Sequence, residues 1–263
     1  PKEFSIVRDI IKLQSVKSHM LDDGYGYVRL SQFHARTGEE LKEHLLALRG
    51  EKPDLFKGLV LDLRNNPGGL LDQAVYVSDL FLADGLIVYT EGRGAQSQMR
   101  FQAQNSGTEP DYPLVVLING GSASAAEIVA GALHDHDRAV ILGEQSFGKG
   151  SVQSIIPLGD QSALRLTTAR YFTPAGISIQ ARGITPDIVV PQMVMTEQSN
   201  GPQMREKDMQ NHFEPLKNSQ PQPEADAGMI EIDATDRQDY QLMRALDLLK
   251  GLEILNRKHP AAA

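Results

Sequence analysis

Two serines stand where a run of apolar residues gives way to small ones. Residues 118–133 read INGGSASAAEIVAGAL, so Ser122 and Ser124 follow two glycines and open an alanine-rich helical stretch. Backbone N–H groups at the beginning of a helix lack internal partners, and together with the helix dipole they can stabilise an oxyanion. A serine hydroxyl placed there could act as the nucleophile of an acyl transfer. The competing interpretation is that the serines only cap the helix, which serine commonly does.

A nucleophilic serine needs a base, and the histidines near this helix are poorly placed to supply one. His134 and His136 lie in LHDHDR at the far end of the helix. At 1.5 Å per residue they are about 15 Å from Ser124. The HDHD pattern is also compatible with a metal site, but both rings sit favourably near a helix C-terminus, which favours a solvated helix exit.

The alternative base is Lys149, which lies in GEQSFGKGSVQ between two glycines that let its side chain turn into a cleft. Lysine accepts a proton only in its neutral form, and burial without a counter-charge favours that form. The neighbours Phe147 and Val152 are apolar, as such surroundings require, and Gln153 could hold the amine by a hydrogen bond. Taken alone, the stretch favours an exposed loop lysine over a buried catalytic one.

Composition narrows the classes of function. The chain has 263 residues, a net charge of −8 and no cysteine, with 41% hydrophobic and 23% charged residues. This length and composition predict a globular protein, either one large domain or a domain with appendages. The negative charge argues against nucleic-acid binding, and the missing cysteines exclude thiol catalysis and Cys-based metal sites. No stretch approaches ~20 consecutive apolar residues, so no membrane span is expected.

The elements that must position Ser124 and Lys149 alternate between strands and helices. Between Gly58 and Glu144 this alternation predicts an α/β core with largely parallel strands, and the later strands predict a more antiparallel addition. Residues 91–111 are polar and predict a loop. The expected strands are two short ones, or one strand with an extension, within 3–21, then 24–30, 58–64, 86–90, 112–119, 138–144, 151–158, 162–173 and 177–180. The expected helices are 37–50, 70–85 and the one that Ser124 opens.

Two of the helices carry readable signals. Thr37 and Glu40 have capping-box spacing at the beginning of the first helix, and Gly50 follows its end. One stripe of the second helix is apolar and predicts the side that faces the core. Its members are Leu70, Ala74, Val77 and Phe81.

The end of the chain changes composition twice. Residues 192–227 are rich in Gln, Pro, Asn and Glu and predict a mobile connector. A helical pattern then resumes in DRQDYQLMRALDLLKGLEIL. Its apolar face predicts docking onto the chain's own domain, or else self-association or a partner helix. That face combines Leu242, Leu246 and Leu249 with Leu248, Leu252 and Leu255.

Four segments together resemble the C-terminal processing peptidases, also called tail-specific proteases. They are LVLDLRNNPGGLL, NGGSASAAEIVAGAL, LGEQSFGKGSVQ and RYFTPAGISIQARGITPDIVV, in the family's order. In that family the second serine of Ser-Ala-Ser is the nucleophile and the lysine of Phe-Gly-Lys-Gly is its base. The resemblance therefore implies Ser124 as nucleophile, Lys149 as general base and Gln153 as the residue that orients it. It further implies an oxyanion hole made by the N–H groups of Ala125 and of a glycine of NPGG, taken as Gly69.

The same resemblance carries expectations for the whole molecule. It implies a fold similar to that of ClpP and crotonase, and a serine endopeptidase that needs no metal or cofactor. The organisation expected is 1–23 as strands that would follow a PDZ module, 24–191 as the catalytic core, 192–227 as a linker and 228–263 as a helical extension. No segment has room for the PDZ module itself. Substrates would be proteins with accessible C-termini in the periplasm or cell envelope of a bacterium, with homo-oligomerisation through the C-terminal helix or an adaptor protein as expected partners.

Other interpretations of the lysine segment are weaker. Residues 143–150 match a nucleotide-binding P-loop at its first seven positions, but Gly150, at the eighth, replaces the Ser or Thr that holds magnesium, and a strand is expected where that loop opens a helix. Ser146 and Lys149 match the S-x-x-K of penicillin-recognising enzymes, but that motif also needs a helix. A catalytically inactive, protease-like scaffold is the remaining alternative.

Overall fold

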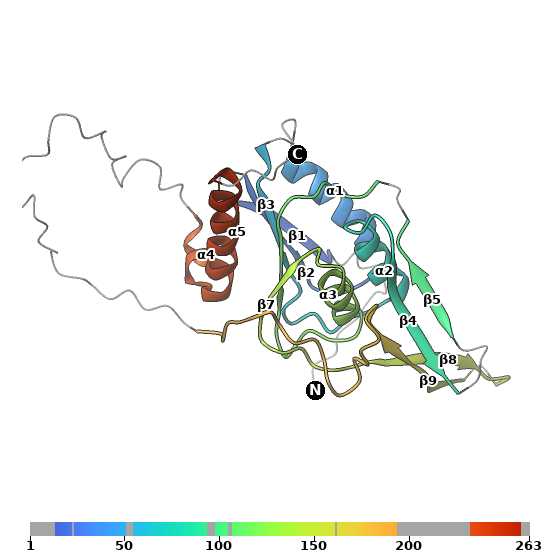
Figure 1. Cartoon of the computed structure of the whole chain (residues 1–263). Coiled ribbons are helices and arrows are strands. Elements are labelled where there is room, and N and C mark those ends of the chain that lie inside the picture. The colour runs from blue at the N-terminus through green and yellow to red at the C-terminus, as the bar shows by residue number, and fades with distance from the viewer. Residues whose placement is uncertain are drawn as a thin grey trace, which may run out of the picture.

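A computed structural model describes residues 14–22, 24–50, 55–93, 98–104, 107–160, 162–193 and 232–258 (Figure 1). The core is a six-stranded sheet with the strand order β1-β2-β3-β6-β7-β10. Strand β1 is antiparallel to β2 and the other neighbours are parallel, which confirms the predicted α/β class with a mostly parallel sheet. The strands are β1 (Val16–Asp22), β2 (Tyr25–Leu30), β3 (Gly58–Asp62), β6 (Leu114–Ile118), β7 (Val140–Gly143) and β10 (Ile188–Val189).

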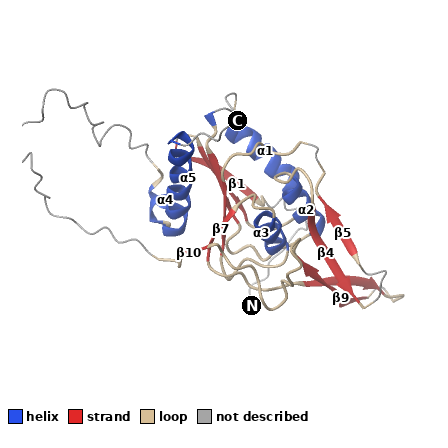
Figure 2. Ribbon diagram, in the orientation of Figure 1, coloured by secondary structure: helices blue, strands red, loops and turns tan. Residues whose placement is uncertain are grey.

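Both faces of this sheet are covered, and its central strands are almost entirely apolar, with Asp62 at the end of β3 as the charged exception. Every residue of β3 and β6 is buried, as in parallel sheets with helices on both sides. Alternate residues of β6 enter different apolar clusters: Val116 packs with α1 (Thr37–Arg49), α2 (Leu71–Asp79) and α3 (Ala125–Asp135), whereas Leu117 packs under α5 (Tyr240–Lys258). Figures 1 and 2 show α5 on one side of the sheet and α1 to α3 on the other.

A second, antiparallel sheet extends from the core, with the strand order β5-β4-β9-β8. It contains β4 (Leu86–Gly92), β5 (Met99–Gln102), β8 (Ser151–Pro157) and β9 (Ala163–Phe172). Two expectations are corrected here. Strand β4 pairs with β5 and β9 and so leaves the parallel core, and β5 forms within residues that were expected to be a loop. Strand β5 has little apolar signal of its own because it is an edge strand, mostly exposed to solvent.

The first two helices form as predicted, with corrections at their beginnings. Helix α1 has Arg36 and not Thr37 as its N-cap residue, and the Thr37 hydroxyl accepts from the N–H of His34 (2.8 Å), three residues before the helix. Glu40 accepts a hydrogen bond from Ser15, so the expected capping box is not formed. In α2 the predicted stripe is buried except for Leu70, which precedes the helix and is exposed.

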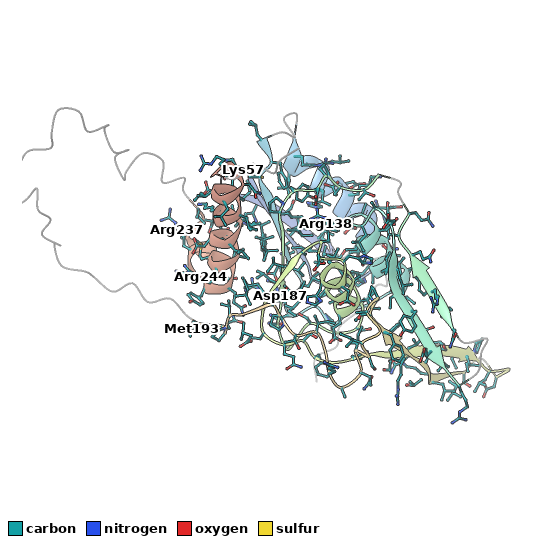
Figure 3. All side chains as sticks on the ribbon, viewed as in Figure 1. Lys57, Arg138, Asp187, Met193, Arg237 and Arg244 are labelled. Carbon is teal, nitrogen blue, oxygen red and sulfur yellow. The ribbon has the colours of Figure 1, made fainter. Side chains whose placement is uncertain are left out.

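The C-terminal helices dock onto the chain's own sheet. Short helix α4 (Ala234–Gln238) leads into α5, whose Leu242, Leu246 and Leu249 are buried against β2, β3, β6 and β7. Leu255, expected to widen that face, is 57% exposed. In Figure 3, Arg237 lies on the side of these helices that faces away from the sheet.

Some expectations fall at the margins of the structure. The segment 177–180 contributes only an isolated bridge between Ser178 and Phe172, and the short strand β10 was not expected. Residues 1–13, with the first expected strand, and 194–231, with most of the expected connector, lie outside the described residues. Across the part of the chain that is described, no helix is both long and apolar enough to cross a membrane.

The docking of α5 can be tested with two leucines of the same helix. Leu246→Ala removes a fully buried side chain and leaves a cavity, so we expect the free energy of unfolding to fall by about 2–5 kcal/mol. Leu255→Ala should change it by no more than about 0.5 kcal/mol, because that side chain is exposed. Urea denaturation of both variants gives the comparison, and equal losses would contradict the docking.

Candidate active site

Ser124 occupies a strained turn between a buried strand and a helix. Strand β6 delivers the chain to Asn119 at the carboxyl edge of the sheet, and α3 begins at Ala125. Ser124 is the N-cap residue of α3, and its φ of 55° and ψ of −112° lie where residues other than glycine rarely occur. Such strain is kept where the surroundings impose it, and it often marks a functional position.

The structure distinguishes the two serines of this turn. Ser122 is fully buried, and its hydroxyl donates to the carbonyl oxygen of Leu63 (2.8 Å) and accepts from the N–H of Asn119 (3.0 Å). Both of its hydrogen-bonding roles are therefore used within the turn. Ser124 is half-buried and sits at the beginning of the helix. Capping and nucleophilic roles are compatible there, because a hydroxyl can accept one hydrogen bond and donate another.

Glu127 joins the turn that carries Ser124 (residues 119–124, the serine turn) to the loop that carries Lys149 (residues 144–150, the lysine loop). Its side chain is fully buried, and its carboxylate accepts four hydrogen bonds. Oε2 accepts from the backbone N–H groups of Ser124 (2.7 Å) and Lys149 (2.9 Å). Oε1 accepts from the Ser146 hydroxyl and the Gly148 N–H, both at 2.6 Å. One carboxylate oxygen thus holds the main chain at both predicted catalytic residues.

The backbone of the lysine loop is also held by the serine turn and by residues 180–181. The Phe147 N–H donates to the Ser122 carbonyl (2.9 Å), and the Ala181 N–H donates to the Gly148 carbonyl (2.8 Å). Gly150 packs so closely that a Cβ atom there would lie 2.3 Å from the backbone nitrogen of Gln180. The glycines beside Lys149 therefore serve close backbone packing, which fixes where the lysine leaves the chain.

The lysine side chain is half-buried, and it forms no salt bridge with any residue that the structure describes. The apolar neighbours expected around it differ from each other. Val152 packs against the core, but Phe147 is 68% exposed, so the expectation that it shields the amine is wrong. Phe147 points outward because its backbone is held by the serine turn.

Gln153 lies on β8, at the point where the pairing with β9 shifts its register between Val152 and Gln153. Such a bulge redirects a side chain. Gln153 is exposed, and within the described residues its side chain has no hydrogen-bond partner. Its orienting role remains a prediction.

The NPGG turn lies directly against the serine. A Cβ atom at Gly68 would lie 2.8 Å from Cβ of Ser124 and 2.9 Å from the Ala125 nitrogen, so only glycine fits. The Gly68 N–H is engaged by Asn66 Oδ1 (2.9 Å). Gly69 pairs with Phe33 as an isolated parallel bridge, a geometry that directs its own N–H away from Phe33. Within the described residues, neither Gly69 N–H nor Ala125 N–H has an acceptor.

The two histidines lie apart from this site, as expected. His134 is near the end of α3, with Nδ1 3.0 Å from Asp135 and Nε2 3.2 Å from Asp187. Burial lowers the pKa of His134, but the hydrogen bond to Asp135 and the charge of Asp187 outweigh it and raise the pKa. His136 Nε2 lies 2.7 Å from the Leu86 carbonyl. No cluster suited to a metal ion occurs among the described residues.

The geometry also bears on the competing motifs. Lys149 is followed by strand β8, so residues 143–150 open no helix that could hold phosphate groups. Ser146 is also outside any helix, and its hydroxyl is committed to Glu127 and to the Ile184 N–H (2.7 Å). Neither a P-loop nor an S-x-x-K arrangement is formed.

Two residues of this site, Glu127 and Gly68, are not among those that the sequence motifs singled out. The capping-box spacing of Ser124 and Glu127 was visible, but the bonds from Glu127 to residues 19 to 22 positions away were not. For Gly68 the only signal was the Pro-Gly-Gly sequence, which did not indicate which glycine touches the serine.

This fold and this site define a class of protein. The pattern of Peptidase family S41 matches residues 24–190, and the chain belongs to that family. It is 49% identical over 254 residues to the carboxy-terminal-processing protease of Bartonella bacilliformis, covering 95% of this chain and 57% of that protein. It is 43% identical over 200 residues to the carboxyl-terminal-processing protease of Synechocystis sp., covering 74% and 46%.

Among solved structures, the photosystem II D1 C-terminal processing protease is similar, with a TM-score of 0.61 and 35% identity. The match covers 69% of this chain and 49% of that structure. This chain thus spans about half the length of the relatives that it matches.

Glu127→Gln tests the link between the two segments. Each carboxylate oxygen of Glu127 accepts from two donors. Glutamine replaces one of these oxygens with an amide NH₂ group, which would face two donors and could not accept from them. We expect the free energy of unfolding to fall by about 1–3 kcal/mol. We also expect slower labelling of the serine by a fluorophosphonate probe. The control is Glu39→Gln, an exposed carboxylate on α1, which should change neither. Unchanged labelling in Glu127→Gln would contradict a positioning role.

Proposed function

We propose that this protein is a serine endopeptidase that cleaves protein substrates near their C-termini, with Ser124 as nucleophile and Lys149 as general base. The observation that supports this most strongly is the Glu127 carboxylate, one oxygen of which binds the N–H groups of both residues. Membership of Peptidase family S41 and the names of its relatives point the same way. The proposed catalytic core comprises residues 24–191.

The proposed reaction is a two-step acyl transfer. The neutral amine of Lys149 takes the proton of the Ser124 hydroxyl while Oγ attacks the scissile carbonyl carbon. The oxyanion that forms accepts hydrogen bonds from the N–H groups of Ala125 and Gly69. The lysine then gives its proton to the departing amine, which leaves an acyl-enzyme on Ser124. Water, deprotonated by the same amine, hydrolyses this ester and restores the hydroxyl.

The surroundings of the two residues fit these roles. The positive φ at Ser124 marks a strained position of the kind that active sites often contain, and its neighbours Ala123 and Ala125 are small, so their side chains would hinder a substrate backbone little. In this proposal Gln153 orients the lysine amine, and a hydrogen bond from its amide would do so without returning a proton. No step requires a metal or a cofactor.

The proposed substrates are proteins whose C-termini are accessible, in the periplasm of a bacterium. Relatives from bacteria carry the name of carboxy-terminal-processing proteases, which supports the substrate class. Assembly through the C-terminal region, or an adaptor that delivers substrates, is part of the same proposal.

Serine labelling and proteolysis test the two roles together. Ser124→Ala should abolish labelling by a fluorophosphonate probe. It should also abolish cleavage of a protein with an unstructured C-terminus, which is measured by mass spectrometry of the termini. Lys149→Ala should reduce cleavage by about 10⁴-fold or more while leaving the thermal midpoint near that of the wild type. The exposed residues Ser162 and Lys42 provide matched controls as Ser162→Ala and Lys42→Ala, which should leave cleavage unchanged. Cleavage by Ser124→Ala would overturn the proposal, and an unlabelled, inactive wild type would favour a scaffold.

The pH dependence of acylation is a separate test. Only the neutral amine can accept the serine proton, so the rate of labelling should rise with pH. A rate that stays flat from about pH 5 to 9 would contradict a lysine base.

A further inference from the structure

A buried arginine connects the turn beside the serine to the C-terminal helix. Arg64 follows strand β3, and its side chain is only 5% exposed. Its guanidinium binds two carboxylates that are 177 positions apart in the sequence, Asp62 on β3 and Asp239 at the beginning of α5. Asp62 binds the Nε/Nη2 edge of the guanidinium and Asp239 binds the adjacent Nη1/Nη2 edge, so one side chain holds both carboxylates.

The sheet side of this connection is rigid. Asp62 is fully buried, and its Oδ1 accepts from the backbone N–H and Nε of Arg64, both at 2.9 Å. Its Oδ2 accepts from Nη2 of Arg64 (2.8 Å) and from the Tyr27 hydroxyl (2.7 Å). Arg64 is therefore held to the end of β3 by both its main chain and its side chain.

The helix side of the connection is built just as specifically. Nη1 and Nη2 of Arg64 donate to the two oxygens of Asp239, at 2.9 and 2.6 Å. Nη1 also donates to Gln241 Oε1 (3.0 Å), while Gln241 Nε2 donates to the Val190 carbonyl (2.7 Å). Asp239 Oδ1 accepts from the Leu242 N–H (3.1 Å) as well, so the carboxylate that binds Arg64 also caps α5.

From Arg64 the main chain continues into contact with the serine turn, residue by residue. The Leu63 carbonyl accepts from the Ser122 hydroxyl. Asn65, with a φ of 56°, donates its N–H to Asn119 Oδ1 (2.9 Å) and accepts from Asn119 Nδ2 (3.1 Å). The Asn66 carbonyl accepts from the Ala123 N–H (2.9 Å). Residues 63–66 are thus bonded to residues 119–123, immediately before Ser124.

We propose that Asp239 is a positioning residue for the active site: by holding Arg64, the docked C-terminal helix fixes the turn that carries Gly68 and Gly69 against Ser124. This inference rests on the function proposed for Ser124. Without Asp239, Nη1 of Arg64 would keep only Gln241 and Nη2 only Asp62 as partners, and the protons that Asp239 now accepts would be buried without an acceptor, a state that favours rearrangement of residues 63–66. The C-terminal helix would then be a condition for activity as well as a cover for the sheet.

The test compares two carboxylate-to-amide changes on the same helix. Asp239→Asn removes the negative charge that faces the Arg64 guanidinium and places an amide NH₂ group, a donor, against the donors of the guanidinium. Glu253→Gln alters the carboxylate that accepts a hydrogen bond from the Tyr25 hydroxyl. Glu253 lies in the C-terminal half of α5, whereas Asp239 precedes its first residue. We expect Asp239→Asn to lower kcat for a peptide substrate by about tenfold with KM changed by less than about twofold, because a charge-assisted bond to a positioning group is lost. Glu253→Gln should leave both constants within about twofold.

Two further measurements separate positioning from a loss of stability. Asp239→Glu keeps the charge and should restore part of the rate. Hydrogen–deuterium exchange of peptides covering 63–70 and 119–126 should be faster in Asp239→Asn than in Glu253→Gln at equal thermal midpoints. The inference is overturned if Asp239→Asn keeps the wild-type kcat and exchange, or if both variants lose activity only as their thermal midpoints fall. An inactive wild type would defeat the proposed function alone, because the exchange comparison still decides whether Asp239 holds the turn.

Discussion

The site depends on one buried negative charge. Moving a carboxylate out of water costs several kcal/mol unless donors surround it, and Glu127 meets that requirement with four hydrogen bonds from two segments of the chain. Because the cost is offset only when every donor is in place, the serine turn and the lysine loop cannot shift independently. The relative position of Ser124 and Lys149 is thereby tied to the stability of the fold.

Each of the two sheets positions part of the site. The parallel sheet delivers Ser124 at the end of β6, at the carboxyl edge where active groups of α/β proteins gather. The antiparallel sheet begins its strand β8 two residues after Lys149 and leaves Gln153 at a bulge. Between them lies the NPGG turn, where Gly68 lets the backbone approach the serine as no larger residue could. The helices on both faces of the parallel sheet keep this edge in place, with α5 linked to it through Arg64.

How much of this could be predicted follows from the range of each interaction. Elements with a strong local signal were predicted close to their bounds: β3 and β6 are nearly continuous apolar runs, and α3 is a run of small and apolar residues after two glycines. The positions of Ser124 and Lys149 were visible as motifs. The polar edge strand β5 has no such signal, and Leu255 follows the helical pattern although it is exposed. The bonds of Glu127 and the contact between Arg64 and Asp239, 175 positions apart, depend on tertiary structure and leave no pattern in a single sequence.

A crystal structure of the protein inactivated by a fluorophosphonate would test the arrangement of the site most directly. The phosphorus atom should be bonded to Oγ of Ser124, with its oxygen accepting from the N–H groups of Gly69 and Ala125. The amine of Lys149 should lie within hydrogen-bonding distance of Oγ, about 3 Å, while Glu127 retains its four donors. A probe attached to another residue, or a Lys149 amine directed into solvent with Glu127 unchanged, would contradict it.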